Sequence, residues 1–266
     1  MYNYEIAIPS YGRAESIKDK TLTLLTKHNI DPKKVTIFVA NESERVKYTK
    51  SLKNTPYNNL VVGEVGIGNI RRFIQGYYDD QVRYMSFDDD LQNLLKKVDD
   101  KNMVPIENLE EEVIFPGFKA AADNNSYMFG IYAAANPMFM KHRVAVGLYF
   151  CVGSCFGIIN RKDVDTIIRV DEKDDYERTI QHYIKDGCVV RLDNITAKTS
   201  YYKEPGGLQL QRTPEWIESC AKQLETLYPD YCTMYIRESN GRAEIRLRDK
   251  RASKKVYGAS LEALFG

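Results

Sequence analysis

An alternation of short apolar runs with longer amphipathic runs over the first ninety residues restricts the fold more than any other feature of the sequence. The runs that predict strands are residues 4–9, 34–40, 59–65 and 82–87. The runs that predict helices are residues 14–29, 42–53 and 66–80. Strands of about six residues separated by helices of about ten to fifteen are typical of βαβ units, and therefore of a mainly parallel sheet. Ligands of such sheets bind beyond the carboxyl ends of the strands, so we expect a site there.

The second part of the chain has a more mixed pattern. We expect strands over residues 126–134, 147–161 and 243–248, and helices over residues 106–124, 174–187 and 213–230. Pro116 is expected to interrupt the first of these helices. In the second helix, one buried apolar face is predicted from the spacing of Tyr176, Ile180, Tyr183 and Ile184.

The domain organisation follows from the absence of breaks in the sequence, which has no internal repeat and no linker rich in glycine, serine or proline. We expect one main domain over residues 1–210, with a first half at about 1–97 and a second half at about 98–210. Residues 211–258 are expected to form an appendage of a helix and a basic strand. The tail over residues 259–266 resembles a cloning remnant, and no function is assigned to it.

Composition excludes several classes of protein. No apolar run approaches the length of a membrane span, and the N-terminus lacks the features of a signal peptide, so we expect a cytoplasmic protein without a membrane partner. The five cysteines are odd in number and scattered, which favours buried free thiols over a zinc site. The net charge of +1 identifies no partner, but residues 237–255 hold eight basic and three acidic side chains.

Three consecutive carboxylates, Asp88, Asp89 and Asp90, follow the fourth predicted strand. Such close charges raise one another's pKa, so we expect a positive group beside them. In extended backbone, Asp88 and Asp90 share a face while Asp89 points away. The shared pair suits Mg²⁺ or Mn²⁺ bound jointly with substrate phosphates. The alternative is an acidic turn that caps the segment 91–98.

A glycine-rich turn, residues 63–68, opens the third predicted helix one strand before the acidic run. Its backbone N–H groups are placed to bind phosphate oxygens, and Arg71 or Arg72 adds a charge-assisted contact. The stretch lacks the Gly-Lys-Ser/Thr ending of a P-loop, and it does not match the dinucleotide fingerprint. Its position therefore matters more than its motif, because it supplies a cation near the carboxylates.

Three motifs in order, "IPSYGR" at 8–13, "GIGNIRR" at 66–72 and "SFDDD" at 86–90, resemble the nucleotide-binding half of a GT-A glycosyltransferase. The acidic run stands where that superfamily keeps its Asp-x-Asp motif. Later runs over 133–139, 147–161 and 171–187 resemble, more narrowly, the TET-associated glycosyltransferases of tailed bacteriophages, which modify oxidised or hydroxymethylated pyrimidines in DNA. The likeness covers roughly residues 4–210.

The resemblance implies a GT-A-like, Rossmann-type α/β fold, with a mainly parallel sheet flanked by helices and a mixed C-terminal part. It also implies a metal-dependent, inverting glycosyltransferase that uses Mn²⁺ or Mg²⁺ and a nucleotide-sugar, expected to be a UDP-sugar. The implied donor-binding residues are Pro9, Ser10, Tyr11, Arg13, Gly68, Arg71, Asp88 and Asp89, and the implied metal ligands are Asp90 and Asp88. Two departures are that Asn41 or Glu42 must replace an acidic donor-contacting residue and that no histidine follows His182.

Sugar transfer needs a base for the acceptor hydroxyl and a cation for the departing diphosphate. For the base we choose Asp175, with Asp174 and Glu177 as reserves. The alternative is that these acids only stabilise the first turn of a helix, whose dipole favours them. The same dipole is expected to lower the pKa of Asp175 and so to weaken it as a base.

The acceptor is expected to be phage DNA that contains a hydroxymethylated pyrimidine, in the cytoplasm of an infected bacterium. The expected DNA contacts are Arg246, Arg248, Lys250 and Arg251. Three alternatives stay open: a glycosyltransferase with a polysaccharide or protein acceptor, a sugar nucleotidyltransferase, and a non-catalytic DNA-binding module.

Overall fold

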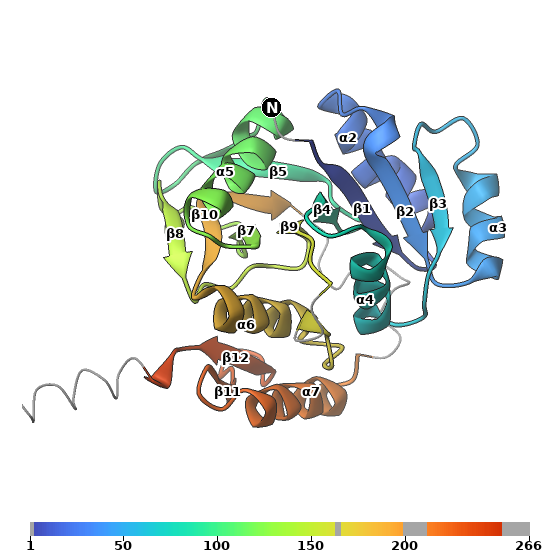
Figure 1. Ribbon diagram of the computed structural model, residues 1–266. Helices are drawn as coiled ribbons and strands as arrows, with labels where there is room; N and C mark the ends of the chain where they lie inside the picture. Colours follow the sequence, from blue (N-terminus) through green and yellow to red (C-terminus); the bar gives the residue numbers. More distant parts are fainter. Residues whose placement is uncertain (1–2, 163–165, 199–211, 252–266) are drawn as a thin grey trace, which may run out of the picture. The chain divides into compact units, whose positions relative to one another are not determined.

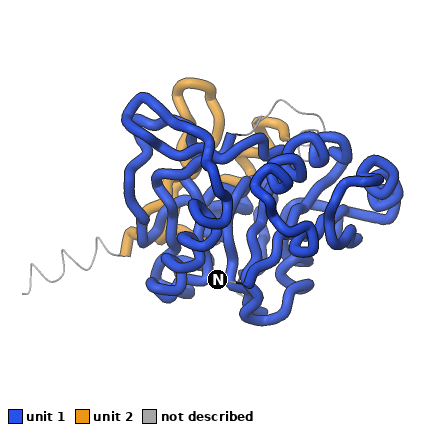
Figure 2. The backbone as a smooth tube through the Cα atoms, turned by 90° about the horizontal axis from the view of Figure 1, so that it is seen from above, with its two compact units in different colours: residues 1–211 blue, residues 212–266 orange. Residues whose placement is uncertain are grey.

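The computed structural model describes residues 3–162, 166–198 and 212–251. The predicted tail over residues 259–266 therefore lies outside the described residues. The chain divides into two compact units, residues 1–211 and residues 212–266 (Figure 2).

The first half of the larger unit is a parallel sheet with helices between its strands (Figure 1). The strands are β1 (Glu5–Ser10), β2 (Val35–Val39), β3 (Asn59–Val62) and β4 (Arg83–Phe87). They lie in the order β3-β2-β1-β4, and every neighbouring pair is parallel, as the alternation predicts. The helical segments are α1 (Ala14–Ile17), a π-helical turn (Lys18–Leu22), α2 (Thr23–Lys27), a 3-10 turn (Pro32–Lys34), α3 (Glu42–Ser51) and α4 (Ile67–Tyr77).

The second half extends the same sheet with strands of mixed direction. Its strands are β5 (Asn93–Lys97), β6 (Met103–Pro105), β7 (Met128–Tyr132), β8 (Val144–Gly147), β9 (Cys155–Ile159) and β10 (Val189–Lys198). The order continues β4-β9-β7-β10-β5-β6, with β8 paired to β10, and β9 runs antiparallel to both β4 and β7. The helical segments are a π-helical turn (Glu110–Ile114), α5 (Phe115–Asp123) and α6 (Asp174–Asp186).

The sheet buries both of its faces, and alternate residues of β1 point to opposite sides. Ile6 and Ile8 belong to a core cluster that includes residues of α2, α3 and α5. Ala7 belongs to the other cluster, which includes Ile70 and Ile74 of α4. A central parallel strand buried on both faces explains the nearly continuous apolar run of β1.

The helix around Pro116 is not interrupted, contrary to the sequence prediction. A π-helical turn over Glu110–Ile114 leads directly into α5, and Pro116 lies in the first turn of α5. The hydrogen-bond pattern changes from π-helical to α-helical directly before Pro116, so the missing N–H of the proline falls at this junction and not within a regular α-helical ladder.

The predicted apolar face of α6 is correct only in part. Ile180 is fully buried and Tyr183 packs against the core, whereas Ile184 is exposed. The other buried residues of this helix are mostly polar and include Glu177, Arg178, Gln181 and His182. The apolar spacing therefore identified the helix but only part of its buried face.

The smaller unit contains α7 (Pro214–Leu227) and a hairpin of β11 (Cys232–Ile236) and β12 (Ala243–Leu247). Thr213 caps α7, where its hydroxyl oxygen accepts a hydrogen bond from the N–H of Trp216 at 3.2 Å. In the described segments, no helix is both long and apolar enough to cross a membrane. All five cysteines are free, and four of them are buried, which confirms the prediction of free thiols.

Candidate active site

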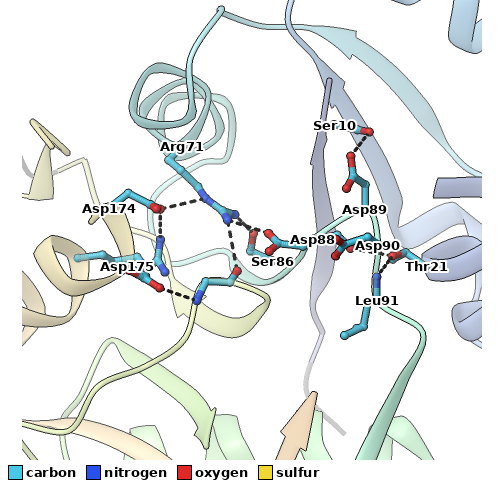
Figure 3. A network of polar contacts seen from close by, with 12 residues as sticks. Ser10, Thr21, Arg71, Ser86, Asp88, Asp89, Asp90, Leu91, Asp174 and Asp175 are labelled. Atoms are coloured by element: carbon cyan, nitrogen blue, oxygen red, sulfur yellow. Dashed lines mark hydrogen bonds and ion pairs between the residues drawn. The ribbon is translucent and has the colours of Figure 1, made fainter. Parts of the chain in front are cut away.

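The acidic turn, Asp88–Asp90, directly follows β4 at the carboxyl end of the parallel strands (Figure 3). Thr21 fixes its backbone: the hydroxyl donates to the carbonyl oxygen of Asp88 at 2.7 Å and accepts from the N–H of Leu91 at 3.0 Å. The N–H of Asp88 donates to the carbonyl oxygen of Ser154 at 3.0 Å. The turn is therefore held by the first helical segment on one side and by the loop before β9 on the other.

Extended geometry predicted that Asp89 points away from the site, but the structure shows that it does not. It is 5% exposed and accepts hydrogen bonds from Ser10 Oγ at 2.5 Å and from Arg13 Nη1 at 2.9 Å. The chain leaves the strand after Phe87, so the alternation of faces ends there. Asp89, Ser10 and Arg13 thus bind one another and tie the end of β1 to the acidic turn, and donor binding by these three residues stays a prediction.

Arg71 of α4 supplies the positive charge that the acidic run requires. Its Nη2 donates to Asp88 Oδ1 at 3.1 Å and to the carbonyl oxygen of Gly153 at 3.3 Å, and its Nη1 donates to Ser86 Oγ at 2.5 Å. Arg71 is only 8% exposed. Burial nevertheless raises the pKa of Asp88 to about 7, with a further contribution from Asp90, because Arg71 compensates only part of the cost.

The other end of Arg71 meets the N-terminus of α6 (Figure 3). Its Nε lies 3.6 Å from Asp174 Oδ2, and the same carboxylate accepts a hydrogen bond from Arg178 Nη1 at 3.2 Å. Asp175 lies beside this pair and accepts from the N–H of Gly153 at 3.3 Å. One arginine therefore bridges the predicted metal-binding turn and the predicted catalytic acids, which are almost ninety residues apart in sequence.

Asp175 has a raised pKa, contrary to the expectation from the helix dipole. Burial is the largest cause and the neighbouring Asp174 adds to it, which brings the pKa to about 7 although Arg178 lowers it. The ideal general base has a pKa near the operating pH. Loss of solvent therefore outweighs the dipole, and it makes Asp175 a better base than the sequence predicted.

Glu177 is excluded as the reserve base. It is fully buried, and its Oε2 accepts hydrogen bonds from the backbone N–H groups of Arg169 at 2.6 Å and Val170 at 2.8 Å. A carboxylate with these contacts holds the preceding loop against α6. Its role is structural, which the sequence pattern of three clustered acids could not reveal.

The glycine-rich turn is less open to a ligand than predicted. The N–H of Gly68 donates to Asp171 Oδ1 at 3.3 Å, so a side chain of this protein already occupies the position proposed for a phosphate. Pro9 is buried at the end of β1, and Tyr11 is 46% exposed beyond it. Arg71, rather than Gly68, is thus the residue of this motif that reaches the acidic turn.

The proposed substitutes at the end of β2 have other partners. Asn41 caps α3 by accepting from the N–H of Glu44 at 3.0 Å, and Glu42 pairs with Arg45 on the surface. The sequence analysis did not identify Glu44 as a residue near the site. Glu44 is 3% exposed and accepts a hydrogen bond from the N–H of Gly12 at 2.7 Å. Replacement of the acidic donor contact by Asn41 or Glu42 stays a prediction.

The four residues predicted to contact DNA lie in the smaller unit and differ in their exposure and in their contacts within it. Arg246 and Arg248 are exposed, whereas Lys250 donates to two backbone carbonyl oxygens, of Pro229 at 2.7 Å and of Cys232 at 3.0 Å. Arg251 pairs with Asp249 at 3.2 Å. Lys250 is thus a structural residue of the hairpin, and the prediction is corrected for it.

The residues of the site fit a divalent cation. Among the described residues, no group of three or more His, Cys, Asp or Glu side chains is placed to hold a metal by itself. Asp88 and Asp90 nevertheless offer carboxylate oxygens from one turn, and such a pair suits Mg²⁺ or Mn²⁺ when a diphosphate supplies further oxygens. The connected network is also acidic, since its charged members are Asp88, Asp89, Asp90, Asp174, Asp175, Arg13, Arg71 and Arg178.

Comparison with protein-family models and with curated protein sequences gives no match. Solved structures do match. The structure of S. aureus TarS 1-349 has a TM-score of 0.54 and 15% identity, and the match covers 85% of this chain and 65% of that one. Glucosyl-3-phosphoglycerate synthase from Mycobacterium tuberculosis, solved with Mn²⁺ and UDP-glucose, has a TM-score of 0.51 and 6% identity, with coverage of 94% and 91%.

These two similarities show the fold. The chain has a mixed α/β architecture with flanking helices and a central sheet whose first four strands are parallel, as in GT-A glycosyltransferases, which confirms the predicted fold class. The chain spans 65% of the TarS structure. The narrower resemblance to the phage TET-associated family, and the roles of the site residues, stay predictions.

Proposed function

We propose that this protein is a metal-dependent glycosyltransferase that moves a sugar from a nucleotide-sugar to a hydroxyl group. The observation that carries the proposal is the bridge formed by Arg71, with Asp88 on one side and Asp174 on the other. The bridge joins the turn proposed to bind the metal to the acids proposed to act on the acceptor, at the carboxyl edge of a GT-A sheet. The two solved structures, one of which contains Mn²⁺ and UDP-glucose, support the same class of donor.

In this proposal the acidic turn holds the donor. Asp90 and Asp88 would hold Mn²⁺ or Mg²⁺, which when bound neutralises charge on the diphosphate as it leaves. Arg71 lies against Asp88 and adds a fixed positive charge at the same place. The raised pKa of Asp88 supports this assignment, because a bound cation would stabilise the ionised form that burial disfavours.

Asp175 takes the proton of the acceptor hydroxyl. Its pKa of about 7 leaves a large fraction ionised at neutral pH while keeping it basic enough to accept a proton. Its bond from the N–H of Gly153 orients the carboxylate. Asp174, which is held by Arg178 and Arg71, acts as the positioning residue of this pair.

For the acceptor we propose a hydroxymethylated pyrimidine in DNA. An aromatic pair lies next to Asp175, the proposed catalytic base. The ring of Tyr176, which directly follows Asp175 in sequence, stacks on the ring of Phe150 with centroids 4.0 Å apart. Both side chains are partly exposed, and Lys173 lies 5.9 Å from the ring centroid of Tyr176, a combination of aromatic rings and a cation that suits contact with a flat nucleic-acid base. The exposed Arg246 and Arg248 of the smaller unit suit contacts with phosphates.

The test is incubation of the protein with Mn²⁺, a panel of UDP-sugars, and DNA that contains 5-hydroxymethylcytosine or 5-hydroxymethyluracil, followed by mass spectrometry of the nucleosides. We expect a glycosylated nucleoside in one combination. Unmodified DNA is the matched control and should give no product. Transfer only to an oligosaccharide or a protein would retain the enzyme class and refute the DNA acceptor, while no turnover of any nucleotide-sugar would refute the class.

A further inference from the structure

A small cavity lies in the larger unit on the α4 side of the sheet, apart from the open edge where Asp90 lies. It has a volume of about 30 Å³, enough for about two water molecules or one small anion. Residues of α4, β4, β9 and α6 line it, together with the loop that precedes α6. The polar lining includes Arg71, Gln75, Arg161, Thr166, Arg178 and His182.

The lining is strongly cationic. Arg72 also contributes, so four arginines and one histidine border the cavity, and none of the described residues that line it is a carboxylate. Nearby carboxylates engage other atoms of these arginines: Asp174 binds Arg178 Nη1 at 3.2 Å, and Asp186 binds Arg161 Nη1 at 2.7 Å. Within the described residues, positive charge is thus concentrated around a space that is not lined by a carboxylate.

Several buried donors at this cavity lack a hydrogen-bond acceptor. Arg178 is 6% exposed and packs its guanidinium 3.7 Å from the ring centroid of Phe156, and within the described part of the chain its Nε and Nη2 have no hydrogen-bond partner. Among the described residues the Nε atom of Arg161 also has no hydrogen-bond partner, and that of Arg71 makes no hydrogen bond but lies 3.6 Å from Asp174 Oδ2. Buried guanidinium N–H groups without acceptors are unfavourable, so a ligand with acceptor oxygens would stabilise this arrangement.

We infer that this cavity binds a small oxyanion of the phosphate class, with Arg178 as its principal donor and Arg71 and Arg161 beside it. A tetrahedral oxyanion offers several acceptor oxygens to guanidinium groups from different elements, and it also reduces the repulsion between Arg71 and Arg178. Burial and Arg71 together lower the pKa of Arg178, in agreement with this crowding. The inference does not rest on the proposed transferase activity, because it follows from the buried donors alone.

Thr166 offers a matched pair of substitutions. Its hydroxyl lines the cavity and accepts a hydrogen bond from Gln75 Nε2. Thr166→Asp adds a carboxylate of similar size that accepts the same bond and supplies the cavity with its own anion. Thr166→Asn has the same shape without the charge, and Thr49→Asp on the exposed surface of α3 controls for the change in net charge.

The experiment is isothermal titration with inorganic phosphate at constant pH and ionic strength, on the full chain without nucleotide. We expect saturable binding to the wild type, binding within about threefold of wild type for Thr166→Asn and Thr49→Asp, and at least about tenfold weaker binding for Thr166→Asp. Wild type that binds no phosphate, or two Thr166 variants with equal affinity, would overturn the inference.

Two further measurements complete the test. Thermal unfolding without phosphate should show Thr166→Asp more stable than Thr166→Asn, because its carboxylate satisfies the buried donors, and the reverse order would count against the inference. Titration with UDP distinguishes the source of the phosphate group. If Thr166→Asp weakens UDP binding as much as phosphate binding, the cavity receives a phosphate of the nucleotide, and if UDP binding is unchanged, its ligand is a free anion.

Discussion

The acidic turn at Asp88–Asp90 and the basic segment formed by β12 and the residues that follow it differ in how their charges find partners. In the acidic turn, Asp89 is 5% exposed, and the three carboxylates meet side chains from β1, from the turn before α1 and from α4, namely Ser10, Arg13 and Arg71. On β12, Arg246 is exposed and lies 5.1 Å from the ring centroid of Tyr235 within its own hairpin, and Arg251 pairs with the nearby Asp249. Burial brings partners from distant elements to the acidic turn, whereas the basic segment makes local contacts near the surface.

The surroundings of a charged segment determine its role. At the end of a buried parallel strand the carboxylates are desolvated, so they require positively charged or hydrogen-bonding partners. The carboxyl end of such a strand is also where ligands of these sheets bind. On a half-exposed strand each charge is screened by water, and its role depends on a ligand outside the chain. We therefore expect substitutions at the acidic turn to have large effects and substitutions on the basic strand to have small ones.

The largest effect is expected for Asp90→Ala. The side chain lies 3.5 Å from Arg13 and takes no part in a core, so its loss should abolish sugar transfer while changing the melting temperature by little. Enzyme assays with Mn²⁺ and circular dichroism melting measure the two quantities. Asp123→Ala on the exposed end of α5 is the control, and full activity of Asp90→Ala would mean that the turn holds no catalytic metal.

The second effect concerns Asp175. Asp175→Asn retains an acceptor for the N–H of Gly153 but cannot take a proton, so turnover should fall by about two to four orders of magnitude. UDP binding should be unchanged, which calorimetry measures. A rate near that of the wild type would show that this acid only stabilises the first turn of α6.

The pH dependence sharpens the same contrast, because the pKa of Asp175 is raised to about 7 from its ordinary value of 3.8. The folded state then binds more protons than the unfolded state between about pH 4 and pH 7, so this residue makes stability fall as pH rises through that range. Asp175→Asn should therefore gain stability relative to the wild type from pH 5 to pH 8. Wild-type turnover should rise through about pH 7. Denaturant titrations measure the stability difference and rate profiles measure turnover, and a change in the opposite direction in either would contradict the prediction.

The fold and part of the site could be predicted from the sequence, for definable reasons. The strands β1 to β4 are buried on both faces, and therefore they appear as apolar runs separated by helices. Asp88 and Asp175 were identified because one follows a strand and the other begins a helix, and Arg71 because it belongs to the motif of the glycine-rich turn.

Other features depend on interactions that no local pattern records. The ten-residue strand β10 was missed because charged residues interrupt it, and in the structure its Asp193 is 1% exposed and paired with Arg143 and Arg191. The structural use of Glu177 likewise arises from a loop that precedes its helix. Arg178 could have been found, since it follows Asp174 by four residues, the spacing of an ion pair on one helical face.

Arg71→Ala is expected to have an intermediate effect on donor binding. It removes the bridge between Asp88 and Asp174, so UDP affinity should fall by about tenfold or more, the usual range for removal of a charge-assisted hydrogen bond, while DNA affinity changes less. Arg45→Ala is the control, because Arg45 is exposed on α3 and pairs with Glu42 away from the acidic turn and the cavity. Equal reductions for UDP and DNA would place Arg71 outside the donor subsite.

The smallest effect is expected on the basic strand. Replacing Arg246 and Arg248 together with glutamine should flatten the log–log dependence of DNA affinity on salt by about one to two units, roughly 0.9 for each phosphate that the protein no longer neutralises. Turnover of the nucleotide-sugar without DNA should be unaffected. Lys250→Gln is the comparison variant: it should destabilise the hairpin without changing the slope, because Lys250 binds backbone carbonyls. An unchanged slope in the double variant would remove DNA from this surface.

The most direct test of the central claim, that the acidic turn binds a divalent cation together with a diphosphate, is electron paramagnetic resonance of Mn²⁺ in the presence of UDP. We predict that the wild type depletes the signal of free Mn²⁺ with a stoichiometry of about one, and that Asp88→Asn combined with Asp90→Asn leaves the signal close to that of Mn²⁺ and UDP without protein. Equal depletion by wild type and the double variant would contradict the account.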